Sequence, residues 1–251
     1  MNSDAILLPD GKLKQELSIP CYFTDGRFAL KPSSFMDMAQ EMAYKASDRL
    51  GFGYDVLMER NAAWVLSRMR FDFVSVPHWR DRVVMFTWHK GTSGPFYLRD
   101  FSLTSPEGSV LVAGTSSWLV IDVKARHIVR DFDVDAIIPA ESICSDDAIA
   151  RNAAKLVCRS SFEPVGVHTV SYSDIDLLGH TNNAMYVRWA ADCIGYDRIA
   201  ERGLKSVEVN FNQETHAGDE VQLGLCESEG AFYVEGSVDG RQSFCTKIVL
   251  G

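Results

Sequence analysis

The second half of this chain repeats the order of features found in its first half, and such a repeat limits the possible folds more than any other part of the sequence. At an interval of 138 residues, Phe73 matches Phe211, His78 matches His216, Asp81 matches Asp219 and Val83 matches Val221. At an interval of 151 residues, two apolar helical segments align, with Phe35 on Tyr186, Met38 on Trp189 and Ala39 on Ala190. We interpret the common order of these pairs as a duplication.

Each half is predicted to contain a long helix and a run of strands. In the first half, apolar residues recur at helical spacing from Phe35 to Leu50, after a cap at Ser33 or Ser34 and before Gly51. A first strand is predicted near Leu17 to Phe23. Four further strands, separated by Gly, Pro and Ser turns, are predicted at 63–74, 82–90, 96–104 and 109–122. Because antiparallel strands of this kind must bury one face on the helix, the fold class is predicted to be α+β.

The repeat divides the chain into two predicted domains. The first covers residues 1–132, the second covers residues 164–251, and residues 133–163 join them. The acidic stretch from Asp131 to Asp147 shows no strand alternation, so we interpret the joining segment as a linker that can hold a short helix.

A polar cluster precedes the apolar helix of the second half. Asp176, His180, Asn182 and Asn183 lie within a few residues of one another, just before the helical pattern begins. Asn182 or Asn183 can cap that helix, because a short side-chain oxygen accepts from the unpaired amides of a first turn. A helix entrance that opens on a pocket presents N–H groups and partial positive charge, which suits an oxyanion. The other interpretation is a cap and a loop residue with no further role.

The spacing of these residues resembles a known signature. Asp-x-x-x-His-x-Asn-Asn-x-x-Tyr-x-x-Trp, from Asp176 to Trp189, is similar to the second-half active-site signature of the acyl-ACP thioesterases of plants and bacteria. The resemblance extends to Asn212-Gln213-Glu214-Thr215-His216, where family members place a catalytic Glu on the segment after the helix. It implies a tandem hotdog fold, in which two antiparallel sheets each wrap around a long central helix. It also implies hydrolysis of fatty acyl-ACP to a free fatty acid and holo-ACP, without a metal or organic cofactor.

The resemblance assigns expected roles to the polar residues. Glu214 would activate a water, and His180 would act as a base or as a polarising donor. Asp176 would fix the tautomer of His180. Asn182 and Asn183 would serve the developing oxyanion at the helix entrance.

The sequence departs from the family pattern at two positions. Leu178 stands where family members usually carry an Asn, so that role must pass to Asn182 or to the backbone, or be dispensable. Thr215 stands where the plant enzymes carry a Cys, and neither motif block places a Cys beside His180. Direct attack by water is therefore favoured over an acyl-enzyme.

The duplication also fails at informative positions. Asp25 matches Asp176, but Ala29 stands in place of His180 and Val76 in place of Glu214. This asymmetry predicts catalysis in the second half and acyl-chain binding or scaffolding in the first.

Several residues of the first half are candidates for substrate contacts. Met38, Met42 and Trp64 could line an acyl tunnel, because Met adapts to flexible chains, although ordinary core packing explains them as well. Arg68 and Arg70 lie on one face of a predicted strand and could recognise an acyl carrier protein or its phosphate. A solvated sheet face is the other interpretation of the two arginines.

Charge and composition bear on the partners. The net charge of −9 argues against a nucleic-acid partner. Residues 1–130 hold 16 Lys and Arg against 14 Asp and Glu, so the first half is the better face for an acidic carrier.

We find no signal peptide and no apolar run of about 18 residues, and therefore expect a soluble cytoplasmic protein without membrane insertion. The six cysteines form no C-x-x-C pair and are expected to be reduced thiols. A fused double hotdog supplies its own pseudo-two-fold partner, which leaves a homodimer possible but not required.

Three other functions remain open from the sequence. An acyl-CoA thioesterase would use the same residues and differ in the surface that binds the carrier. A hotdog hydratase also uses an Asp and a His, but its usual Asp-x-Asn-Pro-x-His differs from the stretch between Asp176 and His180. A non-catalytic acyl-thioester-binding protein would bind without hydrolysis.

Overall fold

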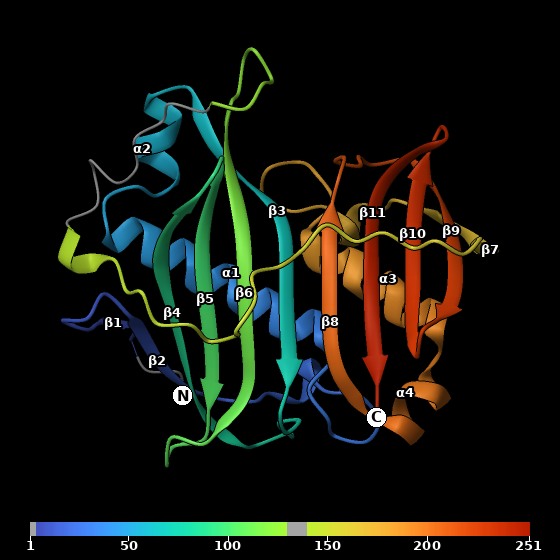
Figure 1. The fold of residues 1–251 in the computed structure, drawn as a ribbon, viewed down its shortest axis with the longest axis horizontal. Helices are drawn as coiled ribbons and strands as arrows, with labels where there is room; N and C mark the ends of the chain where they lie inside the picture. The colour runs from blue at the N-terminus through green and yellow to red at the C-terminus, as the bar shows by residue number, and fades with distance from the viewer. Residues whose placement is uncertain (1–3, 130–139) are drawn as a thin grey trace.

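The computed structural model describes residues 4–129 and 140–251, and its strands form one antiparallel sheet with two long helices on one face (Figure 1). Across the described residues the strand order is β1-β2-β4-β5-β6-β3-β8-β11-β10-β9-β7. The first half supplies β1 to β6 and the second half supplies β7 to β11, so the order of the halves in the chain is also their order across the sheet.

The elements of the first half are β1 (Ile6–Leu7), β2 (Leu13–Ser18), α1 (Pro32–Arg49), α2 (Tyr54–Glu59), β3 (Ala62–Phe73), β4 (Arg82–Ser93), β5 (Phe96–Thr104) and β6 (Val110–Asp122). Those of the second half are β7 (Glu163–Thr169), α3 (Asn183–Ile194), α4 (Tyr196–Arg202), β8 (Leu204–Phe211), β9 (Glu220–Ser228), β10 (Ala231–Val238) and β11 (Arg241–Leu250). Short 3₁₀ turns occur at Cys21–Phe23, Ala140–Ser142 and Tyr172–Asp174.

Strands β3 to β6 agree with the sequence prediction to within a few residues, but two other local predictions were wrong. The strand predicted near Leu17 to Phe23 ends at Ser18, and Cys21–Phe23 is a 3₁₀ turn. Pro20 explains the early end, because proline has no N–H to donate to a strand ladder. The N-cap position of α1 is held by Lys31 rather than by a serine, without a side-chain cap hydrogen bond, and the helix begins at Pro32, whose fixed φ suits the first position of a helix.

Both central helices are buried because their apolar residues recur at helical spacing. In α1, Phe35 is fully buried and its ring lies 4.9 Å from that of Phe71 on β3. In α3, the ring of Tyr186 lies 4.9 Å from that of Phe244 on β11. The two helices contact each other as well as the sheet, so the N-terminus of α3 lies against the middle of α1.

The α+β tandem architecture, with a central helix under each half-sheet, is confirmed. The structure adds that the two half-sheets are continuous, because β3 of the first half pairs with β8 of the second, from Arg68 with Asn210 to Asp72 with Ser206. The two sheets expected from the sequence therefore meet edge to edge in a single sheet.

The described part of the segment between the halves, residues 140–162, crosses the sheet face opposite to the helices (Figure 1). Ala148 N donates to Asp100 Oδ2 at 2.8 Å, and Leu156 N donates to Asn210 Oδ1 at 2.7 Å. These bonds tie the segment to strands of both halves. Of the linker predicted at 133–163, residues 133–139 lie outside the described residues, and a short 3₁₀ helix is present at Ala140–Ser142. No helix in the described part of the chain is both long and apolar enough to span a bilayer.

Candidate active site

A buried threonine network positions the polar loop ahead of α3. Thr215, which is fully buried, shares hydrogen bonds with Thr181 Oγ1 at 2.7 Å and with the Tyr186 hydroxyl at 2.9 Å. Thr181 N also donates to the Thr215 carbonyl at 2.9 Å. These bonds join the loop, the first turn of α3 and the segment after β8. Because the neighbours of Thr181 and Thr215 are His180 and Glu214, the network brings those two side chains together.

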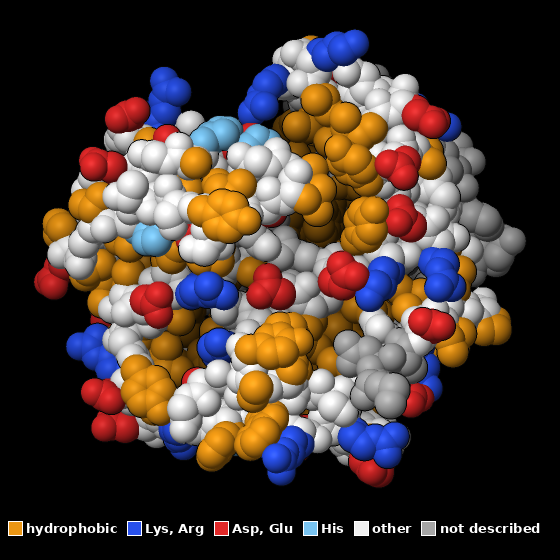
Figure 2. Space-filling model, turned by 180° about the vertical axis from the view of Figure 1, so that it is seen from behind, with side chains coloured by type: hydrophobic (Ala, Val, Ile, Leu, Met, Phe, Trp, Pro, Cys, Tyr) orange, Lys and Arg blue, Asp and Glu red, His pale blue; other side chains and the backbone are white. Residues whose placement is uncertain are grey.

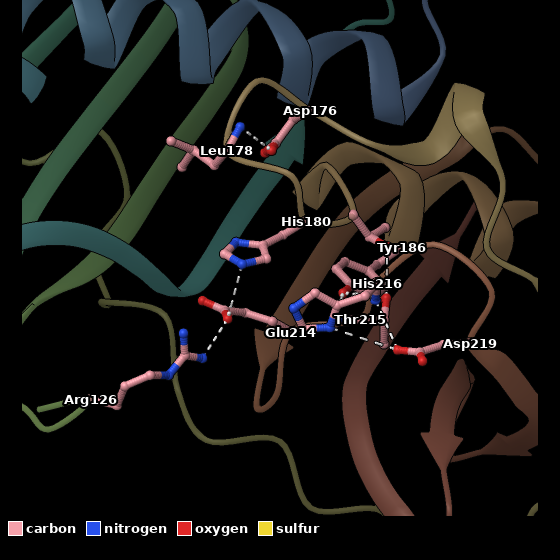
Figure 3. Close-up of polar contacts among 10 residues, drawn as sticks. Arg126, Asp176, Leu178, His180, Tyr186, Glu214, Thr215, His216 and Asp219 are labelled. Carbon is pink, nitrogen blue, oxygen red and sulfur yellow. Dashed lines mark hydrogen bonds and ion pairs between the residues drawn. The ribbon is translucent and has the colours of Figure 1, made fainter. Parts of the chain in front are cut away.

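His180 and Glu214 converge, as the sequence predicted (Figure 3). His180 Nε2 lies 3.5 Å from Glu214 Oε2, and the two side chains are 29% and 30% exposed. The distance is longer than a normal hydrogen bond, which is common for catalytic pairs in the absence of substrate. The ring of His216 lies edge-on to that of His180, with 5.0 Å between centroids.

Arg126 is a third member of this group that the sequence analysis missed. Its Nη2 donates to Glu214 Oε2 at 2.9 Å, and its side chain is 63% exposed. Arg126 lies in the turn after β6, so it reaches the second-half site from the first half (Figure 3). No local pattern marks it, because its partner lies 88 positions away in the chain.

Asp176 lies in the wall of the site, but its carboxylate is used in a turn. Asp176 Oδ1 accepts from Leu178 N at 2.8 Å, which closes an Asx-turn. Figure 3 shows the Asp176 carboxylate hydrogen-bonded to the backbone N–H of Leu178, whereas the imidazole of His180 faces Glu214. Among the described residues, no hydrogen bond or ion pair joins the Asp176 carboxylate to the His180 ring. The structure therefore does not bring this pair together in the way expected for fixing a tautomer.

The two asparagines occupy the helix entrance, as expected. Asn182 is the N-cap of α3, with Oδ1 accepting from Ala184 N at 2.9 Å. Asn183 is the first residue of α3, and both asparagines form hydrogen bonds with the side chain of Gln40 on α1. Gln40 is a second residue that the sequence analysis missed.

These groups line one cavity of about 840 Å³ between the halves. Figure 2, seen from the side opposite to Figure 1, shows a hollow lined by hydrophobic side chains with histidine side chains near its rim. Among the cavity walls, the predicted site residues are Asp176, His180, Asn182, Asn183, Glu214 and Trp64. Further apolar wall residues from the first half are Phe52, Leu57, Leu66 and Trp118. The volume lies within the range of small-molecule sites and suits an apolar chain.

A deeply buried arginine is one of the charged residues that line this cavity. Arg99 on β5 is 5% exposed, and burial lowers the pKa of its guanidinium to about 10. Its Nη1 donates to Thr87 Oγ1 at 3.3 Å. The residue remains protonated at neutral pH and gives part of this wall a positive charge.

Four of the candidate substrate contacts lie away from the cavity walls. Met38 and Met42 are 7% and 2% exposed and belong to the main core cluster, where they pack as ordinary helix residues. Arg70 donates from Nε and Nη2 to Asp72, at 3.1 and 3.0 Å, and Arg68 lies over the Phe96 ring at 4.9 Å. Neither arginine lines the cavity, so their role in carrier recognition stays a prediction.

The site offers no activated nucleophile among its described cysteine and threonine side chains. Burial raises the pKa of Cys193 to about 11, and Cys193 is not part of the cavity wall. Thr215 already shares its hydroxyl with two partners. Glu214 and His180 are the side chains of this site that can activate a water.

His180, Glu214 and His216 form the group of potential metal ligands at this site. Their ligand atoms lie within 4.8 Å of one another. Glu214 Oε2 is paired with Arg126, however, and His216 Nδ1 lies 3.9 Å from Asp219 Oδ2. A cation beside the carboxylate competes directly with a metal, so the set as arranged fits acid–base chemistry better.

The chain matches two family models. Residues 10–134 match the acyl-ACP thioesterase N-terminal domain, and residues 163–241 match the acyl-ACP thioesterase C-terminal domain. Curated relatives include a chloroplastic palmitoyl-acyl carrier protein thioesterase of Gossypium hirsutum, 26% identical over 83% of this chain and 53% of the relative. Another is the chloroplastic oleoyl-acyl carrier protein thioesterase 2 of Arabidopsis thaliana, 22% identical over 85% of this chain and 62% of the relative. The chain thus spans little more than half the length of these relatives.

Solved structures support the same fold. An acyl-ACP thioesterase from Bacteroides thetaiotaomicron superimposes with a TM-score of 0.86 at 22% identity, covering 96% of this chain and 98% of the other. The 12:0-ACP thioesterase from Umbellularia californica superimposes with a TM-score of 0.83 at 17% identity, covering 96% and 97%. The tandem hotdog fold is therefore shared over nearly the whole chain.

Proposed function

This chain belongs to the acyl-ACP thioesterase family, and on that premise we propose that it hydrolyses fatty acyl-[acyl carrier protein] to a free fatty acid and holo-ACP. The observation that carries the proposal is the convergence of His180 and Glu214 at the wall of a largely apolar cavity. A thioester carbonyl placed there would have an acid–base pair on one side and a helix entrance on the other.

The arrangement supports direct attack by water. Glu214 takes a proton from a water, whose oxygen forms a bond to the thioester carbon. The carbonyl oxygen becomes negative and is stabilised by the helix entrance near Asn182 and Asn183, where one donor contributes roughly 10²–10³-fold in rate. The carbon–sulfur bond then breaks, and the thiolate of the carrier receives a proton. His180 lies close enough to Glu214 to share either proton transfer.

The acyl chain is proposed to occupy the apolar part of the cavity. Trp64, Phe52 and Trp118 line it from the first half, and this supports a division of labour in which one half binds the chain and the other carries the chemistry. Location in the cytoplasm and self-association stay predictions.

A free-thiol release assay tests the proposal. Acyl-ACP and acyl-CoA thioesters of several chain lengths would be compared for the wild type, Glu214→Ala and His180→Ala. We expect turnover on acyl-ACP and loss of most of it in both variants, with circular dichroism unchanged. Faster turnover on acyl-CoA would instead favour an acyl-CoA thioesterase. Tight acyl-thioester binding without hydrolysis, unaffected by His180→Ala, would contradict the proposal in favour of a binding protein.

The same assay with a chelator tests whether the cluster of potential metal ligands holds a metal ion that turnover requires. Because Arg126 already neutralises the Glu214 oxygen, we expect turnover to be unchanged by EDTA. Loss of turnover that returns with an added divalent cation would contradict the metal-free mechanism.

A further inference from the structure

Gln40, in the middle of α1, forms a hydrogen-bonded clamp on the helix entrance of the opposite half. Gln40 Nε2 donates to Asn182 Oδ1 at 3.1 Å, and Asn183 Nδ2 donates to Gln40 Oε1 at 2.9 Å. All three side chains are partly buried and line the cavity. The clamp joins residues that are 142 and 143 positions apart in the chain.

The helix cap fixes the direction of every bond in this clamp. Asn182 Oδ1 accepts from the backbone N–H of Ala184, so the side-chain oxygen, and not the nitrogen, must face the helix. Gln40 must then present its nitrogen to Asn182 and its oxygen to Asn183. Since a backbone N–H can only donate, the orientation of the three amides follows from a single fixed donor.

One amide group is left over. Asn182 Oδ1 is occupied by two protein donors, whereas Asn182 Nδ2 has no hydrogen-bond partner among the residues that the structure describes. Asn182 lines the cavity, so this nitrogen is the part of its amide available to a bound molecule. Leu178 stands at the position where the family usually carries Asn, and it has no side-chain amide that could serve as a donor.

We propose that Gln40 is a positioning residue. It holds the Asn182 side chain so that Asn182 Nδ2 donates to the carbonyl oxygen of the thioester. The inference rests on the proposed hydrolysis and names the group that stabilises the oxyanion and the residue that orients it. By the interval of 151 that aligns the helices, Gln40 corresponds to Ala191 and Asn182 to Lys31, so the clamp can form on one side of the molecule only.

Asn182→Asp and Gln40→Leu separate the donor from its support. Asn182→Asp keeps both acceptor bonds but replaces the Nδ2 donor with an acceptor oxygen and adds a negative charge. Gln40→Leu removes the clamp at nearly constant volume and adds no charge. We expect Gln40→Leu to lower kcat by roughly 10²-fold and Asn182→Asp by at least as much, with KM nearly unchanged, because the lost interaction acts on the transition state. The double variant should lose little more than Asn182→Asp alone, since both substitutions remove the same donor interaction.

Gln40→Glu gives a readout that a purely structural role would not move. The ionised carboxylate can only accept, so it cannot donate to Asn182 Oδ1, whereas the protonated carboxyl restores one donor and one acceptor. The quantity to measure is the ratio of the variant's kcat to the wild-type kcat at each pH. We expect this ratio to rise at least about tenfold as the pH falls from roughly 8 to roughly 5, the range in which a carboxyl group with a perturbed pKa becomes protonated. Gln222→Glu, the same substitution at an exposed position of β9, should show no such rise.

The outcomes separate this inference from the proposed function. Wild-type turnover with unchanged kcat in Gln40→Leu, or a Gln40→Glu variant with the pH profile of the wild type, would overturn the clamp alone. Strictly additive losses in the double variant would do the same. If Gln40→Leu fails to fold, the pH profile of Gln40→Glu still decides. Absence of wild-type turnover on every thioester would defeat the proposed function, and the inference with it.

Discussion

The loops before α1 and α3 share the same turns and bridges but carry different side chains at the positions proposed for chemistry. Asp25 Oδ1 accepts from Arg27 N at 2.8 Å, as Asp176 Oδ1 accepts from Leu178 N at 2.8 Å. A 3₁₀ turn precedes each loop, and the residue pairs Thr24 with Leu30 and Ile175 with Thr181 form equivalent bridges. All of these positions are related by the interval of 151 found in the sequence.

The segments that face these loops also correspond. His78 N donates to Asp81 Oδ2 at 2.8 Å, and His216 N donates to Asp219 Oδ2 at 2.8 Å. Against this shared frame, Ala29 and Val76 stand where the second half carries His180 and Glu214. The first loop adopts the fold without that pair, so neither His180 nor Glu214 is needed for the backbone. Their presence in the second half is better explained by chemistry.

Glu214→Gln should give the largest effect and is the strongest test of this contrast. Loss of a general base typically costs between about 10² and 10⁴ in kcat, while the isosteric amide preserves the fold. Thiol release under saturating acyl-ACP would measure it. Val76→Ala, at the corresponding position, should leave kcat within a few fold, and equal losses at both positions would remove the functional distinction between the halves.

His180→Gln is expected to lower kcat by about 10²-fold or more, since the ring can no longer transfer a proton beside Glu214. Transplanting the pair into the first half, through Ala29→His with Val76→Glu in the His180→Gln background, should not restore turnover. Neither Ala29 nor Val76 lines the cavity formed by the described residues. Recovery in the transplant would show that the cavity does not decide which half is active.

Arg126→Ala tests the contribution of the first half to the acid–base pair. The Arg126 side chain is 63% exposed, and ion pairs of this kind are worth up to about 1 kcal/mol. We expect kcat to change by less than about tenfold, and the difference from the wild type should shrink at high salt because exposed charges are screened. A loss as large as that of Glu214→Gln would assign Arg126 a direct part in the chemistry.

Asp176→Asn and Asp25→Asn form a matched pair. Asn keeps the side-chain oxygen that closes each Asx-turn, so both variants should unfold within about 0.5 kcal/mol of the wild type. On the geometry seen here, turnover should also stay within a few fold in both. If only Asp176→Asn loses turnover, the charge of Asp176 acts on the site as the family resemblance implies.

Cys193→Ala should have the smallest effect. Burial raises the pKa of this thiol to about 11, so it is protonated at neutral pH, and it lies outside the cavity wall. Thiol release in the variant should match the wild type. Complete loss of turnover in a normally folded variant would reopen the covalent mechanism.

The sequence predicted the elements and the central pair because both depend on short-range patterns. Periodicity located α1 and strands β3 to β6, and two motif blocks located His180 and Glu214. The pattern did not reveal the early end of β2, since a single Pro20 overrides the propensity of its apolar neighbours.

Long-range partners could not be predicted in the same way. Gln40 and Arg126 gain their roles from residues 142 and 88 positions away, and nothing in their local sequence distinguishes them from surface residues. Met38 and Met42 show what helical periodicity alone does not predict. Helical spacing indicates that they are buried, but it does not indicate whether the buried face meets the cavity or the sheet.

The pairing of β3 with β8 gives this protein a property that an assembly of separate hotdog subunits lacks. Gln40 and Arg126 reach their partners across a junction held within one chain, so their effective concentration at the site is set by the covalent link. Dilution cannot separate them. Activity per molecule should therefore stay constant down to concentrations at which a two-chain site would come apart.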